Sequence, residues 1–303
     1  MILEIVFLGT GASVPSKERS SPCVAVRRGS DITLFDCGEG SQRQLMISSL
    51  SFMRVERIFL SHLHGDHILG LPGLLQTMSL IGRVKPLAVY GPTGAISALK
   101  SMMELCHGGI GFEVIARELK DGIVVEMAEF TIEVCSSEHG VDSLAYVYRE
   151  FPKPGRFRKE KAISLGIPEG PLFSRIQNGE SIMIGDRIIE PNEVCGPERP
   201  GRSISYSGDT LPSAAFKEMS RNVDVMIHEA TFLESEKELA LKYYHSTAKQ
   251  AAAIAREADV DMLVLTHIST RYKESIKIIK EAKKEFSNVH LAHDFFSVML
   301  SFK

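Results

Sequence analysis

The most constraining feature of the sequence is a cluster of metal-binding residue types where a predicted strand gives way to a helix. Residues 61–67, Ser-His-Leu-His-Gly-Asp-His, hold three of the chain's ten histidines and one aspartate. The apolar run before them, Arg57–Ser61, predicts a buried strand, and the leucines after them predict the apolar face of a helix with Pro72 in its first turns. Ligand-binding groups of α/β folds lie at such strand-to-helix loops. The cluster therefore predicts an α/β fold with a functional site at this loop.

Four side chains of this loop can bind a metal: His62, His64, Asp66 and His67. Neutral imidazole nitrogens and carboxylate oxygens suit zinc, and suit manganese or iron less well. Four donors within six residues cannot easily converge on one ion without strain, whereas two neighbouring ions can share them. The alternative is a surface cluster of histidines, or histidines with satisfied hydrogen bonds in the core. We interpret the loop as a metal site.

Histidine, aspartate or glutamate residues also end four later apolar runs. His139 follows the second strand of a hairpin predicted at 123–127 and 130–135, and on its own it is equally well a core histidine. The pattern recurs at the ends of three further predicted strands, which carry Asp209, Glu229 and His267. Five strand ends in both halves of the chain thus carry such residues. This regularity favours one shared site over unrelated core side chains.

A loop with two glycines, Asp36-Cys-Gly-Glu-Gly40, follows the last of three strands predicted at 2–8, 23–28 and 32–36. Glycine permits backbone conformations and close approaches that a Cβ atom would prevent. The two glycines would let this loop approach the metal loop or a ligand. An ordinary tight turn is an equally supported alternative.

His245 lies just before a predicted helix and not at a strand end. Thr247 and Gln250 match a capping box at the start of the alanine-rich helix 248–258. From its position alone, His245 is either a functional residue or a helix-entry residue with a polar tip. A further predicted helix, 271–286, carries interspersed Lys and Glu, which predicts a solvated face. The histidines without a partner pattern are interpreted as structural: His107, His290 and His293.

Residues 150–200 differ in composition from the two flanking halves. Between Arg149 and Lys161, six basic residues stand against two acidic ones, and Pro and Gly interrupt the whole segment. This composition predicts an inserted arm with little core of its own and a positive surface that suits a phosphate backbone. A solvated surface loop is the alternative. Because the net charge of the chain is −3, nucleic-acid binding would have to use such a local patch.

Composition predicts a globular protein from a reducing compartment. Hydrophobic residues make up 44% of the chain and charged residues 24%, as is ordinary for soluble domains. The five cysteines are scattered and never spaced as Cys-x-x-Cys, which favours reduced thiols over a disulfide framework or a thiolate metal site. The N-terminal run Met1–Leu8 predicts a strand and not a signal peptide, and no apolar run is long enough to cross a membrane. We therefore expect a cytoplasmic protein.

The order of the candidate ligands resembles that of the metallo-β-lactamase superfamily: His62-x-His64-x-Asp66-His67, then His139, Asp209 and His267. Five further stretches resemble more closely the ribonuclease Z family of tRNA 3′-processing endonucleases: Phe35–Leu45, Leu69–Leu74, Ser207–Thr210, His228–Thr231 and His245–Thr247. The resemblance runs nearly end to end and includes the arm, whose Gly170-Pro171 resembles the family's glycine-proline exosite element. The metal motif is shared by many hydrolases, whereas this combination is far more specific.

The resemblance implies an α/β fold, the αβ/βα metallo-β-lactamase sandwich with a small protruding arm. Residues 1–303 would form a single domain with an exosite arm inserted at 150–200, and each half of the chain would supply one layer. The implied metal ligands are His62, His64 and His139 for one ion, Asp66, His67 and His267 for the other, and Asp209 bridging both. Two Zn²⁺ ions are expected, with Mn²⁺ or Fe²⁺ as alternatives. The implied catalytic residues are Asp66 as a proton acceptor and the pair Glu229 and His245.

The implied reaction removes the 3′ trailer from precursor tRNA by two-metal phosphodiester hydrolysis and leaves a 3′-hydroxyl on the tRNA. The family is typically a homodimer in which the arm of one subunit holds the tRNA that the other cleaves. Two alternatives remain open. One is a superfamily hydrolase of small phosphodiesters, in which the arm plays no part in substrate binding. The other is a non-catalytic RNA-binding scaffold, against which the complete ligand set argues.

Overall fold

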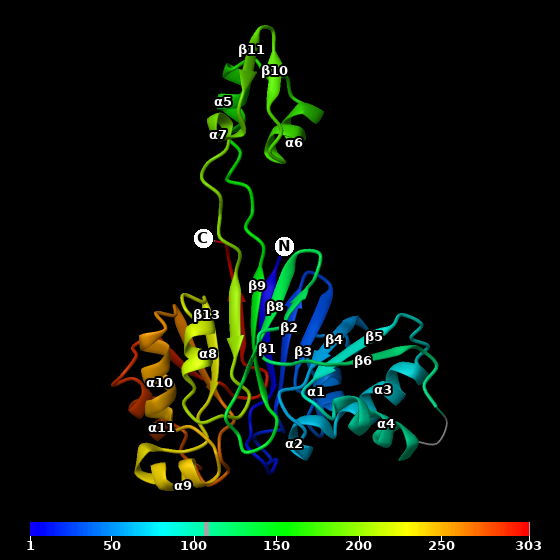
Figure 1. The fold of residues 1–303 in the computed structure, drawn as a ribbon, viewed down its shortest axis with the longest axis vertical. Coiled ribbons are helices and arrows are strands. Elements are labelled where there is room, and N and C mark those ends of the chain that lie inside the picture. The colour runs from blue at the N-terminus through cyan, green and yellow to red at the C-terminus, as the bar shows by residue number, and fades with distance from the viewer. Residues whose placement is uncertain (106–108, 303) are drawn as a thin grey trace. The chain divides into compact units, whose positions relative to one another are not determined.

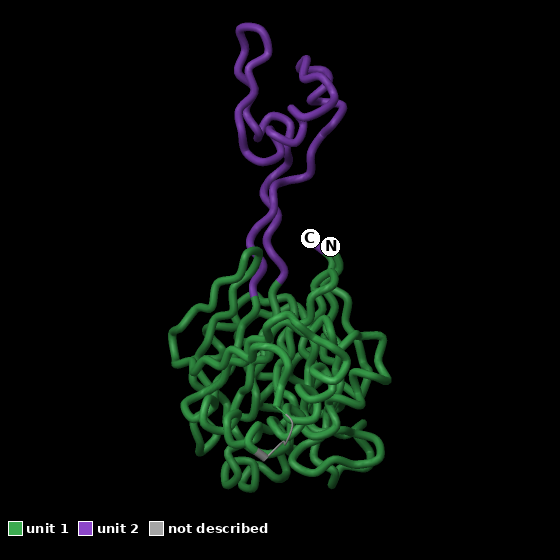
Figure 2. The backbone as a smooth tube through the Cα atoms, turned by 90° about the vertical axis from the view of Figure 1, so that its right-hand side faces the viewer, with its two compact units in different colours: residues 1–148, 203–301 green, residues 149–202, 302–303 purple. Residues whose placement is uncertain are grey.

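The structure, a computed structural model, describes residues 1–105 and 109–302, which form two compact units (Figures 1 and 2). Unit 1 comprises residues 1–148 and 203–301, and unit 2 comprises residues 149–202 with Phe302. Cys106 and His107, for which the sequence predicts a reduced thiol and a structural role, lie outside the described residues. Each unit is described by itself.

Unit 1 is built on two seven-stranded sheets. The first has the order β16-β1-β2-β3-β4-β5-β6, formed by β1 (Leu3–Gly9), β2 (Cys23–Arg28), β3 (Asp31–Phe35), β4 (Val55–Phe59), β5 (Leu87–Gly91), β6 (Val114–Glu118) and β16 (Ser297–Leu300). The second has the order β15-β14-β13-β12-β9-β8-β7, formed by β7 (Val124–Glu126), β8 (Phe130–Ser136), β9 (Leu144–Glu150), β12 (Ser203–Tyr206), β13 (Val225–Glu229), β14 (Met262–Thr266) and β15 (Val289–Leu291). The strands and the hairpin expected from the sequence are thus confirmed, with boundaries shifted by one or two residues.

The expectation that each half of the chain supplies one layer is wrong for four strands, because β7, β8 and β9 from the first half join the second sheet and β16 joins the first. β16, near the C-terminus, leaves the second sheet and pairs antiparallel with β1, with Leu3 opposite Leu300. Phe296, just before β16, packs on Phe7 of β1 with ring centroids 5.8 Å apart. Its backbone oxygen also accepts a hydrogen bond from the backbone N–H of Phe7 at 2.9 Å. Pairing with β16 also covers an edge that β1 would otherwise leave open.

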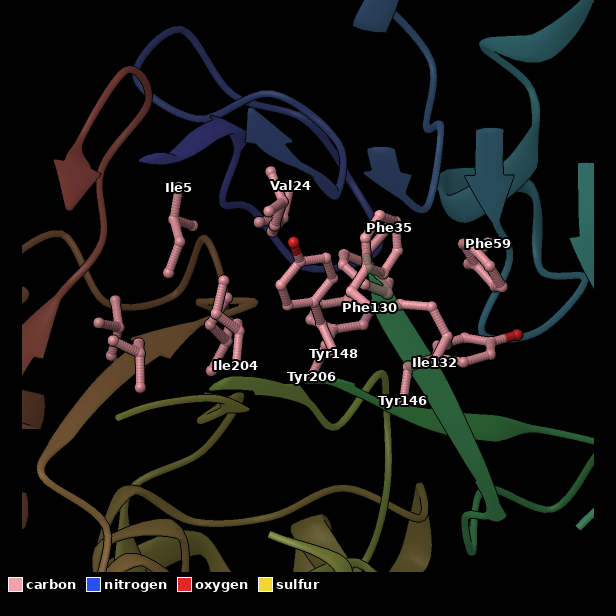
Figure 3. Packing of buried hydrophobic residues seen from close by; sticks show 14 of the residues in the cluster. Ile5, Val24, Phe35, Phe59, Phe130, Ile132, Tyr146, Tyr148, Ile204 and Tyr206 are labelled. Atoms are coloured by element: carbon pink, nitrogen blue, oxygen red, sulfur yellow. The ribbon is translucent and has the colours of Figure 1, made fainter. Parts of the chain in front are cut away.

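The alternation of side chains along the strands builds three layers of core. In β1, Ile5 and Phe7 point into the space between the two sheets, whereas Val6 and Leu8 point to the outer helices. Aromatic rings fill the space between the sheets, where Phe59 and Tyr146 meet edge to face at 5.3 Å (Figure 3). Each sheet is therefore covered on one face by its partner and on the other by helices.

The first sheet is covered by α1 (Ser41–Ile47), α2 (Gly65–Ile68), α3 (Leu71–Leu80) and α4 (Ala95–Leu105), with the short 3-10 turn η1 (Phe52–Arg54). The second is covered by α8 (Ala214–Met219), α10 (Ala248–Glu257) and α11 (Ile276–Ala282), with η2 (Glu234–Glu236) and α9 (Lys237–Lys242) beside them (Figure 1). Pro72 lies in the first turn of α3, and the capping box of Thr247 and Gln250 opens α10, both as expected. The αβ/βα sandwich is confirmed.

The helix expected over 271–286 is shorter than the sequence suggested. The structure has α11 only at Ile276–Ala282. Arg271 contacts Glu236 at 2.8 Å, and the hydroxyl of Tyr272 accepts a hydrogen bond from the backbone of Leu233 at 3.0 Å. These tertiary contacts hold both residues away from a helical path, because local helix propensity is a weak preference that such contacts override.

Unit 2 contains short elements around a small apolar core. They are α5 (Lys159–Ser164), α6 (Pro171–Gln177), the hairpin β10 (Ile182–Ile184) and β11 (Arg187–Ile189), and α7 (Pro191–Val194). The core consists of Ala162, Ile167, Ile176, Ile182, Ile189, Val194 and Cys195, which is more than the Pro- and Gly-rich composition indicated. Two extended segments join through antiparallel bridges of Lys153 with Arg199 and Phe157 with Cys195. The unit therefore has a fold of its own, with Gly170-Pro171 at the start of α6.

Four of the cysteines, Cys23, Cys37, Cys135 and Cys195, are free thiols buried in the structure. Burial raises the pKa of Cys23 and of Cys135 to about 12, so both stay protonated. None of the helices in the described ranges combines the length and the apolar content that crossing a lipid bilayer requires.

Candidate metal centre

The structure brings the seven predicted ligands together from both sheets of unit 1. They are positioned by strand ends and by one short helix: His62 and His64 follow β4, Asp66 and His67 lie in α2, His139 follows β8, Asp209 follows β12, and His267 follows β14. Because the strands are rigid and buried, the loops that follow them hold their side chains in fixed directions. Four of the five strand ends singled out in the sequence supply these residues, and the fifth, at the end of β13, places Glu229 beside His267.

Asp209 lies at the centre of the group. Its Oδ2 atom is 3.2 Å from Nε2 of His267 and 3.3 Å from Nε2 of His67. The same oxygen is 3.7 Å from Nε2 of His139 and 3.8 Å from Nε2 of His62. Four imidazoles, two from each implied ligand set, thus point the same nitrogen at one carboxylate oxygen.

The donor atoms form triads on both sides of Asp209. His62, His64 and His139 have donor atoms within 4.8 Å of one another, and so do Asp66, His67 and His267. A third such triad, His62, His67 and Asp209, joins the two. These spacings match two adjacent cation sites that share a bridging carboxylate. His245 also falls within this distance of His139 and Asp209, so its role depends on its other contacts.

Three of the imidazoles have a buried Nε2 atom that no hydrogen bond in the described part of the chain satisfies. The Nε2 atoms of His62, His67 and His267 have no hydrogen-bond partner among the described residues. A buried polar atom left without a partner destabilises the fold by roughly 1–3 kcal/mol, and native proteins rarely tolerate several together. Their convergence on one carboxylate oxygen therefore fits bound metal ions.

Asp36 orients two candidate ligands, His67 directly and His62 through Ser61, by way of the Nδ1 atom of each ring. Its Oδ2 accepts hydrogen bonds from Nδ1 of His67 at 2.8 Å, from the hydroxyl of Ser61 at 2.8 Å and from the hydroxyl of Tyr206 at 2.6 Å. Because Ser61 gives its only hydroxyl proton to Asp36, the Ser61 oxygen is left to accept from Nδ1 of His62 at 3.0 Å. Both imidazoles then carry a proton on Nδ1, which makes Nε2 the nitrogen that can bind a metal.

Thr231 does the same for His267 on the opposite side. Its hydroxyl donates to Oε2 of Glu229 at 2.6 Å, so its oxygen accepts from Nδ1 of His267 at 2.8 Å. Nδ1 of His139 donates instead to the backbone oxygen of Tyr244, at 2.8 Å. Each of these contacts fixes a tautomer that suits metal binding through Nε2.

Burial and neighbouring charges set the protonation of the ligands. Burial lowers the pKa of His62 and of His139, which favours the neutral imidazole that binds metals. Burial alone would raise the pKa of Asp209, but the imidazoles of His267 and His67 hold it well below its usual range. Burial opposes protonation of His67, yet Asp209 and Asp36 raise its pKa, so a cation bound there displaces a proton.

Glu229 and His245 form a buried pair beside the ligands. Oε1 of Glu229 lies 2.7 Å from Nδ1 of His245, and Glu229 also accepts hydrogen bonds from the backbone of Thr210 and of Thr231. Burial lowers the pKa of His245, but the Glu229 carboxylate outweighs it and raises that pKa to about 9. The pair is thus a carboxylate with an imidazolium whose Nδ1 is occupied, while the ring lines the cleft.

A cleft of about 410 Å³ opens over the cluster. Its floor includes His64, Asp66, His139, Asp209 and His245. The volume lies within the range of about 300–1,000 Å³ that small ligands or single nucleotide units need.

The glycines of the loop after β3 serve different purposes. A Cβ atom on Gly38 would meet the backbone oxygen of Asp66 at 2.1 Å, which confirms the predicted close approach to the metal loop. Gly40 has φ 84° and nothing within 4 Å of a Cβ, so it is the tight-turn residue that the alternative described.

Asp36 and Thr231 hydrogen-bond to the candidate ligands without belonging to either donor triad, and the sequence did not single them out. Asp36 ends a buried strand in the same way as the predicted site residues, so the strand-end pattern contained the signal. Its φ of 59° is a left-handed conformation that costs a non-glycine residue of order 1–3 kcal/mol and is retained mainly at functional sites.

His228, next to Glu229, lies on the opposite face of β13 and packs against Phe216.

Comparisons with known proteins show what the chain is similar to. Two family models match parts of the chain: "Anti-Pycsar protein Apyc1" over residues 3–142 and "Beta-lactamase superfamily domain" over residues 195–268. The chain is 44% identical to ribonuclease Z of Methanosarcina acetivorans over 303 residues, which cover 100% of the chain and 99% of that protein. It is 39% identical to ribonuclease Z of Bacillus subtilis, covering 98% of both. The fold is also similar to that of the crystal structure of the short form of human tRNase Z, with a TM-score of 0.71 and 28% sequence identity. This similarity covers 97% of the chain and 98% of the human chain.

Proposed function

The chain belongs to the ribonuclease Z family, and from that premise we propose that it is an endoribonuclease that removes the 3′ trailer from precursor tRNA. The observation that carries the proposal is the pair of donor triads joined by Asp209 at the floor of the cleft, with the Glu229–His245 pair on the same cleft. This arrangement offers binding groups for two cations and a proton donor for a leaving group.

We propose two zinc ions as the cofactor, with manganese or iron as alternatives. His62, His64 and His139 would hold one ion, Asp66, His67 and His267 would hold the other, and Asp209 would bridge them. Imidazole nitrogens with few carboxylates are the donor set that zinc prefers. When bound, such a pair of ions stabilises negative charge on the phosphate and supplies hydroxide at neutral pH.

The chain's own groups would then manage the protons. Attack of hydroxide on phosphorus breaks the bond from phosphorus to the 3′ oxygen of the tRNA, so the phosphate stays on the 5′ end of the trailer. Asp66, whose Oδ2 accepts a hydrogen bond from the backbone of Ser13 at 3.0 Å, would accept the proton that the nucleophile releases. His245 would donate a proton from Nε2 to the departing 3′ oxygen or stabilise the charge on the phosphorane.

Glu229 keeps His245 in the state that this step requires. Its carboxylate holds the Nδ1 proton at 2.7 Å and raises the pKa of the ring, so the imidazolium is available at neutral pH. Hydrogen bonds from Thr210 and Thr231 fix the carboxylate, which lets Glu229 act as a positioning residue without touching the substrate.

Residues 150–200 would serve as the exosite for the tRNA. Arg156, Arg158 and Lys159 are exposed, and exposed cations attract a phosphate backbone without reading its sequence. We further propose a cytoplasmic homodimer in which the arm of one subunit grips the tRNA that the other cleaves. Sedimentation of the purified protein tests the dimer, and a monomer at assay concentrations would contradict it.

One experiment tests the central proposal against the small-molecule alternative. Metal content would be measured on the purified protein, and the same preparation would be assayed on precursor tRNA and on a small aryl phosphodiester. We expect two metal equivalents, cleavage that leaves a 3′-hydroxyl on the tRNA, and a kcat/KM for precursor tRNA far above that for the small ester. Turnover of the small ester alone would instead identify a general phosphodiesterase, and no turnover of either would favour a scaffold.

A further inference from the structure

The rim of the cleft carries an aromatic side chain, Tyr243, to which the proposed chemistry assigns no role. Tyr243 lies directly after α9, lines the cleft and is 51% exposed. Val14 lines the same cleft and is 64% exposed. A polar floor below a partly apolar rim is the surface that a nucleotide needs, because its phosphate is charged and its base presents flat apolar faces.

The backbone around Tyr243 is anchored to His139 of the candidate metal centre and to α9. The next residue, Tyr244, accepts a hydrogen bond from Nδ1 of His139 at 2.8 Å through its backbone oxygen. Tyr244 has φ 58°, a left-handed conformation that turns the chain sharply between Tyr243 and His245. The backbone N–H groups of Tyr243 and His245 donate to Leu239 at 3.0 Å and Ala240 at 2.8 Å. The backbone that carries Tyr243 is therefore tied to α9 and, through Tyr244, to His139 of the site.

Cations accompany the ring. The ammonium group of Lys242 lies 5.5 Å from the centroid of the Tyr243 ring. Arg271 lines the same cleft, where its guanidinium is held by Glu236 at 2.8 Å and lies 4.9 Å from the ring centroid of Phe232. Single-stranded nucleic acids are bound by this combination, in which aromatic rings stack on bases and cations attract the phosphates between them.

We propose that Tyr243 stacks on the base of a nucleotide next to the scissile phosphate and thereby positions the single-stranded 3′ region of the RNA in the cleft. The inference rests on the proposed endoribonuclease function and adds a substrate-binding residue to it. Because every base has a π face, stacking on Tyr243 accepts any base at that nucleotide. The ring selects an unpaired nucleotide, because the faces of a base within a duplex are already covered by its neighbours.

Three single variants separate stacking from a structural role. Tyr243→Ala should lower kcat/KM for precursor tRNA by roughly 5- to 150-fold, the usual effect of removing one stacked aromatic ring, mainly by raising KM. Tyr243→Phe keeps the ring and should stay near wild type. Leu241→Ala is the matched control, because Leu241 lies in the same helix, is 64% exposed and does not line the cleft. All three should retain wild-type metal content, and an equal loss in Tyr243→Phe and Tyr243→Ala would overturn stacking.

Abasic substrates test the contact itself. Two precursor tRNAs would each lack one base, either at the last nucleotide of the tRNA or at the first nucleotide of the trailer. With wild-type protein, one of them should show a loss similar to that of Tyr243→Ala on the intact precursor. On that substrate Tyr243→Ala should cause no further loss, because the partner of the ring is already gone. A full additional loss on both abasic substrates would overturn the proposal. Failure of the wild type on the intact precursor would instead overturn the proposed function.

Discussion

Asp209 is the single residue on which both halves of the candidate site depend. Its one carboxylate oxygen faces four imidazole nitrogens at 3.2–3.8 Å, and no other described side chain faces both donor triads in this way. A bridging carboxylate offsets charge on two cations at once, whereas a terminal ligand affects one. The consequences of removing it should therefore extend across the whole centre.

Asp209→Ala should abolish cleavage of precursor tRNA and weaken the binding of both metal ions. Metal analysis of the purified variant is the decisive measurement. Asp142→Ala is a suitable control, because Asp142 is an exposed carboxylate only three residues from His139. If Asp209→Ala kept two full equivalents of metal, the bridge would be ruled out.

His245→Ala should lower turnover by roughly 10²- to 10⁴-fold, as expected for the loss of a general acid, while metal content stays normal. The reason is that Nδ1 of His245 is occupied by Glu229 and not by a cation site. Glu229→Gln should cause a smaller loss of turnover, because it weakens the hold on the Nδ1 proton but keeps the ring in place. Loss of a metal ion from His245→Ala would make His245 a ligand and the assignment wrong.

Asp36→Asn should weaken metal binding although Asp36 is not a ligand. Three donors, from His67, Ser61 and Tyr206, share its Oδ2 atom, and an amide cannot accept all three bonds while keeping its own NH₂ satisfied. Loss of such an outer partner typically lowers metal affinity by about 10- to 100-fold. Competition with a chromophoric chelator measures the affinity directly. Unchanged affinity would show that the Asp36 contact does not orient the imidazoles.

The candidate ligands could be selected from the sequence and the residues that orient them could not, for a physical reason. Histidine and aspartate carry metal-binding chemistry in the residue type itself, so a repeated position at strand ends is enough to select them. The roles of Asp36 and Thr231 depend on hydrogen bonds of hydroxyl groups: Ser61 donates to Asp36, and Thr231 donates to Glu229. Which acceptor a hydroxyl group has is decided by the three-dimensional structure. Tyr243 likewise could not be selected from the sequence, because only the structure shows that it lines the cleft.

At the scale of elements, helices and strands could be predicted where they depend on neighbouring residues. They could not be predicted where contacts with distant parts of the chain determine their length or pairing. The capping box of α10 involves Thr247 and Gln250 alone, and it forms as expected. The early part of the helix expected over 271–286 is lost to contacts with η2, more than thirty residues away in the chain. β16 joins the first sheet because Phe296 fits against Phe7, which no short pattern reveals.

The arm should affect RNA binding without affecting the chemistry. We expect Arg156→Ala, Arg158→Ala and Lys159→Ala together to raise KM for precursor tRNA. The variant should also flatten the dependence of log K on log salt, by about 0.9 for each lost contact on a duplex-like backbone. Hydrolysis of a small phosphodiester should stay near wild type, because these residues lie outside every proposed ligand motif.

A matched control for the arm variant is available in unit 1. Lys277, Lys280 and Lys284 are exposed on or beside α11, in agreement with the solvated face expected there. Their combined replacement by Ala removes the same charge from a different surface and should leave KM and the salt slope unchanged. Equal losses of the arm variant on both substrates would mean that the arm supports the fold, and no loss on either would favour a small-molecule hydrolase.

At the scale of the whole molecule, the proposed homodimer assigns the arm and the active site of one reaction to different subunits. That assignment can be tested by mixing two defective proteins. One subunit would carry Asp209→Ala, with an intact arm and no active site. The other would carry Arg156→Ala, Arg158→Ala and Lys159→Ala, with an intact site and no grip on RNA. Each protein alone should be nearly inactive at low concentrations of precursor tRNA.

Co-expression or reversible dissociation of the two variants would produce mixed dimers. If the arm acts on its partner's site, each mixed dimer has one competent combination: the arm of the Asp209→Ala subunit serving the site of the other. Random exchange should then restore roughly one quarter of wild-type activity, because about half of the dimers are mixed and each has one of two pairs intact. If the arm served the site of its own subunit, mixing would restore nothing, because no subunit would hold both parts. Activity at low precursor concentration, measured before and after exchange, decides between the two arrangements.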